Sequence, residues 1–180
     1  MRQDFHHFVE LLSRSCADVH DTYYQLPQAR GDRAYRERVY CYELYHQMRC
    51  RWAEFPYSLG GEVDKAGHPI FRGGPYRYSK PDFLVHVPGN MRGNLAVVEV
   101  KASTASPNAI RADIEKLAWF CGEPACYYGA VLLVYGDRTS FDDAQPELQA
   151  IVENSGASQF VLARHGNVGD PARVFAAVGS

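Results

Sequence analysis

Apolar residues recur at helical spacing through most of the first 52 residues. Residues 3–24 carry one apolar stripe, which predicts a first helix that ends before Leu26-Pro27. Residues 35–52 contain no Gly or Pro, and their apolar positions surround nearly the whole helical circumference. We therefore expect a second, largely buried helix in this segment.

A strand pattern follows this helical half. Gly-rich turns punctuate residues 56–78, which predicts a strand pair or an irregular hairpin near a sheet. Residues 82–87 and 95–101 form two stronger apolar strands, and the short loop between them favours an antiparallel hairpin.

The last part of the chain alternates between helix and strand. Ser106-Pro107 supplies an N-cap and a first-turn proline for a helix that stops at Gly122. A buried strand over 127–135, a helix over 145–153 and a last strand over 159–163 complete the pattern. The fold class predicted is α/β, with a mixed central sheet flanked by helices.

Length and composition favour a single folded domain over 1–180. The chain has 180 residues, of which 46% are hydrophobic and 22% charged, a globular composition. No apolar run approaches the roughly 20 residues of a membrane helix. The N-terminus lacks the apolar stretch of a signal peptide, and five scattered cysteines suit reduced thiols. We expect a cytoplasmic protein without a membrane partner.

The formal net charge of -2 hides a segregated distribution. Between residues 28 and 101, 12 Lys and Arg stand against 8 Asp and Glu, whereas the remainder has 7 against 13. A basic patch attracts polyanions whatever the total charge, so this segment could face the phosphates of a nucleic acid. The alternative is that the arginines are scattered over a solvated surface.

Charged side chains gather at one end of the predicted hairpin. If Asp82 pairs with Glu99, two carboxylates stand about 5 Å apart and repel by roughly 3 kcal/mol at an effective dielectric near 20. Lys101 relieves part of this repulsion. A divalent cation relieves it more completely, because two carboxylates, a backbone carbonyl and waters form the oxygen shell that Mg²⁺ or Mn²⁺ takes. The alternative is an edge strand in another register, whose ionic ends reach water.

These residues resemble a known family. Pro81-Asp82, followed on the next strand by Glu99-Val100-Lys101, resembles the PD-(D/E)xK phosphodiesterase superfamily, which has the restriction-endonuclease-like fold. The resemblance implies that Asp82 and Glu99 bind a catalytic Mg²⁺ or Mn²⁺ together with the carbonyl of Val100. Lys101 would position or deprotonate the attacking water and steady charge near the scissile phosphate.

The resemblance covers residues 35–135 and implies an αβββαβ core, whose first helix often carries a further acid. We rank Glu43 as this third acid, with Glu37 as a less buried competitor and a solvated helix edge as the alternative. Glu62, before the motif, is the other candidate for a second metal or its water shell. Asp113 and Lys116 are expected to form an ordinary surface ion pair, with a supporting role for Lys116 as the alternative.

The resemblance implies a metal-dependent nuclease whose catalytic residues are Asp82, Glu99, Lys101 and Glu43. It favours DNA over RNA, and leaves target choice to loops, a homodimer or a partner protein. One alternative is a catalytically inactive, nuclease-like subunit that binds nucleic acid or serves assembly. Another is an α/β interaction domain with an accidental likeness, which predicts Asp82 and Glu99 on different faces of the sheet.

Overall fold

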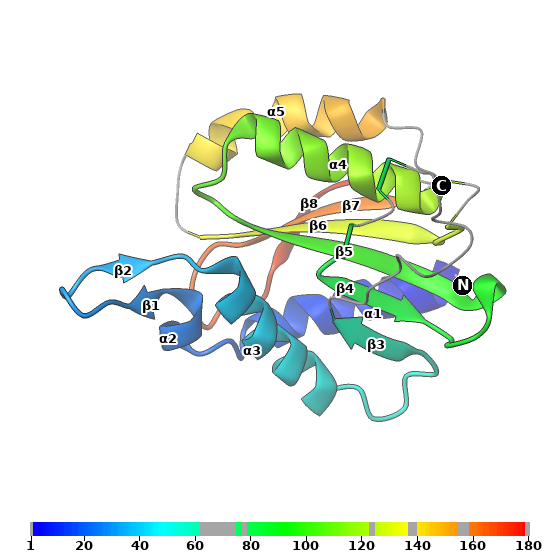
Figure 1. Cartoon of the computed structure of the whole chain (residues 1–180), viewed down its shortest axis with the longest axis horizontal. Helices are drawn as coiled ribbons and strands as arrows, with labels where there is room; N and C mark the ends of the chain where they lie inside the picture. The colour runs from blue at the N-terminus through cyan, green and yellow to red at the C-terminus, as the bar shows by residue number, and fades with distance from the viewer. Residues whose placement is uncertain are drawn as a thin grey trace.

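The computed structural model describes residues 2–61, 75–76, 79–122, 125–136, 140–154 and 159–178. At its centre is a mixed six-stranded sheet in the order β3-β4-β5-β6-β7-β8 (Figure 1). Its strands are β3 (Ser58–Gly61), β4 (Phe83–His86), β5 (Asn94–Ala102), β6 (Gly129–Tyr135), β7 (Phe160–His165) and β8 (Arg173–Val178). β5, β6 and β7 run parallel, and the other neighbours pair antiparallel.

Helices cover both faces of this sheet, as the sequence predicts (Figure 1). One face carries α1 (Arg2–Cys16) and α3 (Glu37–Cys50), with α2 (Asp21–Tyr24) and the small ladder β1 (Leu26–Pro27) and β2 (Arg33–Ala34) beside them. The other face carries α4 (Pro107–Cys121) and α5 (Ser140–Glu153). A 3₁₀ turn, η2 (Met91–Gly93), lies in the β4–β5 loop. None of the helices in the described ranges is long and apolar enough to cross a membrane.

Each face of the sheet has its own apolar core, and β5 contributes to both. Val98 and Val100 pack among the side chains of α1 and α3, whereas Val97 packs among those of α4 and α5. Because strand side chains alternate between faces, Glu99 and Lys101 follow Val97 onto the α4 face. The first turn of α3 and the middle of α4 supply the residues that contact these two charges.

The predicted hairpin is confirmed, and its register shows which residues of the motif lie opposite each other. Phe83 pairs with Val98 and Leu84 with Val97, so continuing the ladder by one residue sets Asp82 opposite Glu99. The helix predicted to end at Gly122 is also confirmed as α4: Ser106 Oγ accepts from the Ala109 amide at 3.3 Å, and Pro107 is the first helical residue.

Two predictions for the N-terminal helices are wrong. The single helix over 3–24 is broken between Cys16 and Asp21, because the turn there brings both Val19 and Tyr24 into the core. The second helix is not buried all round, since Tyr42 is 60% exposed. Tyrosine tolerates this position because its ring carries a polar hydroxyl.

The strand over 159–163 is not the last one. β7 extends to His165, and β8 adds an antiparallel edge that the sequence analysis missed. β8 is apolar at every position after Arg173, and it lies at the edge of the sheet, where Val174 has 48% of its surface in solvent. All five cysteines are free thiols, as expected.

Candidate functional site

The end of the β4–β5 hairpin brings Asp82 and Glu99 together. Asp82 Oδ2 accepts a hydrogen bond of 2.7 Å from the Val100 amide, and Glu99 is buried, with 3% of its surface exposed. The positive charge of Lys116 acts to lower the pKa of both carboxylates. Their placement across the ladder contradicts the different-face arrangement that an accidental likeness predicts.

The surroundings penalise the ionised forms of both acids. Burial, and then the charge of Asp82, raise the pKa of Glu99 to about 8, although Lys116 opposes the shift. Burial also raises the pKa of Asp82 to about 6, and the Val100 amide opposes that shift. The repulsion expected from the sequence is therefore present, and the cations nearby do not cancel it.

Two lysines link the acids into what we call the carboxylate–lysine cluster. Lys101 Nζ lies 3.4 Å from Glu37 Oε2 and 3.1 Å from Asp113 Oδ2. Lys116 Nζ lies 2.8 Å from Glu99 Oε1 and 3.0 Å from Asp113 Oδ1. With Asp82, the cluster has four carboxylates and two ammonium groups, a formal charge of -2 when all are ionised.

The prediction that Asp113 and Lys116 form an ordinary surface pair is wrong. Asp113 is buried, with 7% of its surface exposed, and Lys116 also reaches Glu99 on the neighbouring strand. Position 113 precedes Leu117 by four residues, so it shares the face on which α4 packs against the sheet. The sequence analysis instead treated Asp113 as a surface residue.

The structure brings Glu37, the competitor, into the cluster instead of Glu43. Glu37 Oε1 accepts from the Ala102 amide at 3.2 Å while its other oxygen meets Lys101. Glu43 accepts a 2.7 Å hydrogen bond from Gln47 on its own helix, and six residues set it about 9 Å further along the axis. Glu62 lies outside the described residues.

The signal for Glu37 was its position in the first turn of α3. A first-turn carboxylate reaches past the helix end, and that end of α3 lies at the carboxyl end of β5. The sequence analysis searched for the acid with the most apolar neighbours, which selected Glu43 instead.

Lys101 is held as an ammonium in this arrangement. Burial alone would lower its pKa, but the carboxylates of Asp113 and Glu37 outweigh burial and raise the pKa above its usual value. An ammonium has no lone pair with which to take a proton. Of the two roles implied for Lys101, the geometry therefore favours positioning and charge neutralisation over deprotonation of water.

The donor chemistry of this hairpin end fits a hard divalent cation. Val100 donates its amide to Asp82, and since a strand residue's amide and carbonyl point the same way, its carbonyl also faces the Asp82 side. Glu99 Oε1 is buried without a well-aligned hydrogen bond, although Lys116 lies within ion-pair distance. Two carboxylates, one carbonyl and a formal charge of -2 match Mg²⁺ or Mn²⁺.

The described residues do not form a ready-made cage for a metal. Within those ranges, no group of three or more His, Cys, Asp or Glu side chains is arranged to hold an ion. At this hairpin end the ammonium of Lys116, rather than a third carboxylate, faces Glu99. A cation at Asp82 and Glu99 would therefore share them with Lys116.

The arginines of the predicted basic segment have different surroundings. Arg36 and Arg38 are exposed and flank Glu37 in the sequence. Arg33 and Arg51 are paired with Asp21 and Asp18, as expected of a solvated surface.

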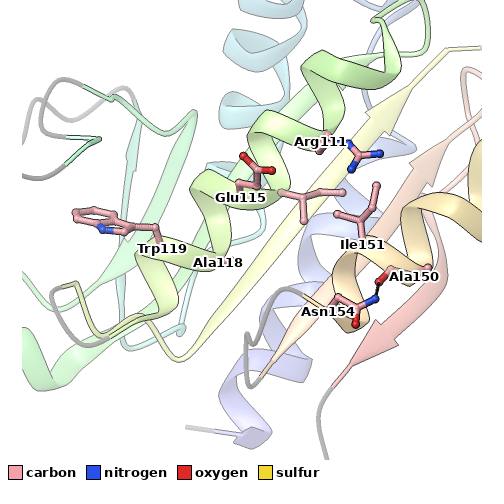
Figure 2. Close-up of a pocket in the computed structure, with 8 residues that line it drawn as sticks. Arg111, Glu115, Ala118, Trp119, Ala150, Ile151 and Asn154 are labelled. Carbon is pink, nitrogen blue, oxygen red and sulfur yellow. Dashed lines mark hydrogen bonds between the residues drawn. The ribbon is translucent and has the colours of Figure 1, made fainter.

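Two hollows differ in their relation to the cluster. A groove of about 640 Å³ between α4 and α5 contains Arg111, Glu115 and Trp119 on one wall and Ile151 on the other, and no cluster residue lines it (Figure 2). A pocket of about 280 Å³ between α3, β3 and β4 includes Asp82 in its wall. The smaller pocket is therefore the one that adjoins the candidate site.

Comparison with known proteins adds no identification. No protein-family model, curated protein or solved structure gives a significant match to this chain.

Proposed function

We propose that the protein is a nuclease of the PD-(D/E)xK type that uses Mg²⁺ or Mn²⁺ to hydrolyse phosphodiester bonds. The observation that carries this proposal is the meeting of Asp82 and Glu99 at one hairpin end, with Lys101 two residues further along β5. A buried carboxylate and a half-buried one, both with raised pKa values, are costly to retain, and groups of this kind concentrate at functional sites.

Each residue has a distinct role in the proposal. Asp82, Glu99 and the Val100 carbonyl would hold the cation, which supplies Lewis acidity and positive charge at the phosphate. Lys101 contributes a fixed ammonium that neutralises charge developing on the scissile phosphate. Glu37 positions Lys101, since it contacts both its Nζ and the Ala102 amide.

The order of the elements supports the proposal. From α3 to β6 the chain runs helix, three strands, helix and strand. Among the described residues, this order agrees with the αβββαβ core that the family likeness implies, with Asp82 just before β4 and Glu99 and Lys101 on β5. DNA is the favoured substrate through the same family likeness, and exposed Arg36 and Arg38 suit a phosphate backbone.

A second candidate is an inactive, nuclease-like subunit that binds nucleic acid or serves assembly. The observation in its favour is the 2.8 Å contact between Lys116 and Glu99. Such a pair places a positive charge beside Glu99 without a metal, so a protein released from chemistry could keep these carboxylates.

A cleavage assay separates the two candidates. Plasmid, single-stranded DNA and RNA are incubated with the protein in Mg²⁺ or Mn²⁺, and in EDTA. We expect cleavage of DNA that EDTA abolishes, because the cation is part of the proposed site. Absence of cleavage, together with no uptake of either cation in calorimetry, would reject the nuclease and leave the second candidate.

Glu37 and Glu43 form a matched pair of acids on one helix. We expect Glu37→Gln to lower the cleavage rate about 10- to 100-fold, since it loosens a residue that orients Lys101. Glu43→Gln should leave the rate within about twofold. Initial rates on the same DNA measure both variants, and the reverse order would restore Glu43 as the functional acid.

A further inference from the structure

An aromatic pocket shares a wall with the proposed metal site. Tyr42 and Tyr45 come from α3, Gly61 from the end of β3, and Phe83 from β4, and Asp82 closes one side. The rings of Tyr45 and Phe83 lie nearly parallel, with 27° between their planes and 6.4 Å between centroids. Tyr42 is 60% exposed, so its ring is available to an incoming group.

The chemistry of this pocket selects a flat, uncharged ligand. Aromatic walls favour another π-face, and none of the described residues that line the pocket is a Lys or Arg that would hold a phosphate inside it. Its volume of about 280 Å³ is below the roughly 300–1,000 Å³ of pockets for drug-sized ligands, which suits one ring system. A nucleobase meets these requirements.

We propose that this pocket binds one unstacked base of a single-stranded DNA substrate, next to the phosphodiester that the cluster acts on. The inference rests on the proposed function, because a base and its phosphate are joined through one sugar. A base in this pocket lies against Asp82, and Asp82 is also part of the proposed metal site. A base inside a duplex is stacked on both sides, so it enters the pocket only after leaving the helix.

Gly61 offers a way to fill the pocket without replacing an aromatic residue. A Cβ atom at Gly61 would stand 3.7 Å from both the Tyr45 ring and the Asp82 carbonyl oxygen, which is ordinary contact. Gly61 is exposed, so Gly61→Leu should fold normally while its side chain occupies the space for the base.

Binding measurements test the pocket. Fluorescence anisotropy follows a labelled 12-nucleotide DNA strand and its duplex, with Ca²⁺ in place of Mg²⁺. We expect Tyr42→Ala and Gly61→Leu each to weaken single-strand binding about tenfold and to leave duplex binding within twofold. Tyr42→Phe keeps the ring and should bind like the wild type. Tyr23→Ala removes another exposed tyrosine, on α2, and is the matched control.

The outcomes distinguish this inference from the nuclease proposal. Three results would each reject the base-binding pocket. Tyr42→Ala could bind the single strand as tightly as the wild type does, the variants could lose equal affinity for single strand and duplex, or the wild type could fail to bind the single strand. Cleavage in Mg²⁺ is measured separately. Single-strand binding that depends on Tyr42, without cleavage, would support the pocket and reject the nuclease. Cleavage without Tyr42-dependent binding would support the nuclease and reject the pocket.

Discussion

Lys101→Ala is expected to lower the rate of DNA cleavage about 100- to 1,000-fold. The Lys101 ammonium is fixed between Glu37 and Asp113, so it needs no reorganisation to face a developing negative charge. Removing one preorganised stabiliser of this kind costs an enzyme about two to three orders of magnitude in rate. Initial rates on plasmid in Mg²⁺ measure the loss.

Controls must separate lost chemistry from lost structure. Lys101→Ala leaves two carboxylates without their ammonium, so the fold is checked by circular dichroism and by the melting temperature. Arg173→Ala removes an exposed cation from β8, four strands away from β4, and should cut like the wild type. If Lys101→Ala cuts as fast as the wild type, the cleavage comes from another site or a contaminant.

The hairpin and its register were predictable from the sequence because two short-range patterns agreed. Strand alternation and a short loop allow few pairings, and one of them sets Asp82 against Glu99. The helix α4 was predictable for a similar reason, since its N-cap serine, its first-turn proline and Gly122 are all local signals.

The partners of the charged residues were harder to predict because they depend on helix placement. Lys116 reaches Glu99 across from α4 to β5, and Glu37 reaches Ala102 from the start of α3. The contact between Lys116 and Glu99 has no local signature, and the first-turn position of Glu37 indicates only that its side chain reaches past the helix end, because the partners are far apart in the sequence. The break after Cys16 was missed for the same reason, because the core position of Tyr24 depends on its hydrogen bonds to the carbonyls of His165 and Gly166.

These long-range contacts change the argument for a cation. From the sequence, the two carboxylates required a positive charge that Lys101 alone did not supply. In the structure Lys116 contacts Glu99 directly, yet the pKa of Glu99 remains raised to about 8. The two carboxylates therefore still favour an additional positive charge, which either a proton or a divalent cation can supply.

Because a proton supplies this charge in the absence of a metal, the protein is expected to lose stability as the pH rises in EDTA. Glu99 has a pKa of about 8 when folded and an ordinary value of 4.5, so between these values the folded state holds a proton that the unfolded state has lost. The free energy of unfolding should then fall with pH by up to about 1.4 kcal/mol per pH unit. The fall stops above the folded pKa. His165, with an ordinary pKa of 6.5, is neutral in both states above pH 7.

Urea unfolding at pH 7 and pH 8, in EDTA and in 10 mM Mg²⁺, measures this dependence. We expect the wild type to lose about 1 kcal/mol across this interval in EDTA, and Mg²⁺ to stabilise it more at pH 8 because metal ligands must be ionised. Glu99→Gln cannot ionise, so it should lose the pH slope and the Mg²⁺ effect together, while Glu43→Gln keeps both. A wild type with no slope and no response to Mg²⁺ would show that Lys116 already balances the two acids, and the case for a bound cation would fail on that result.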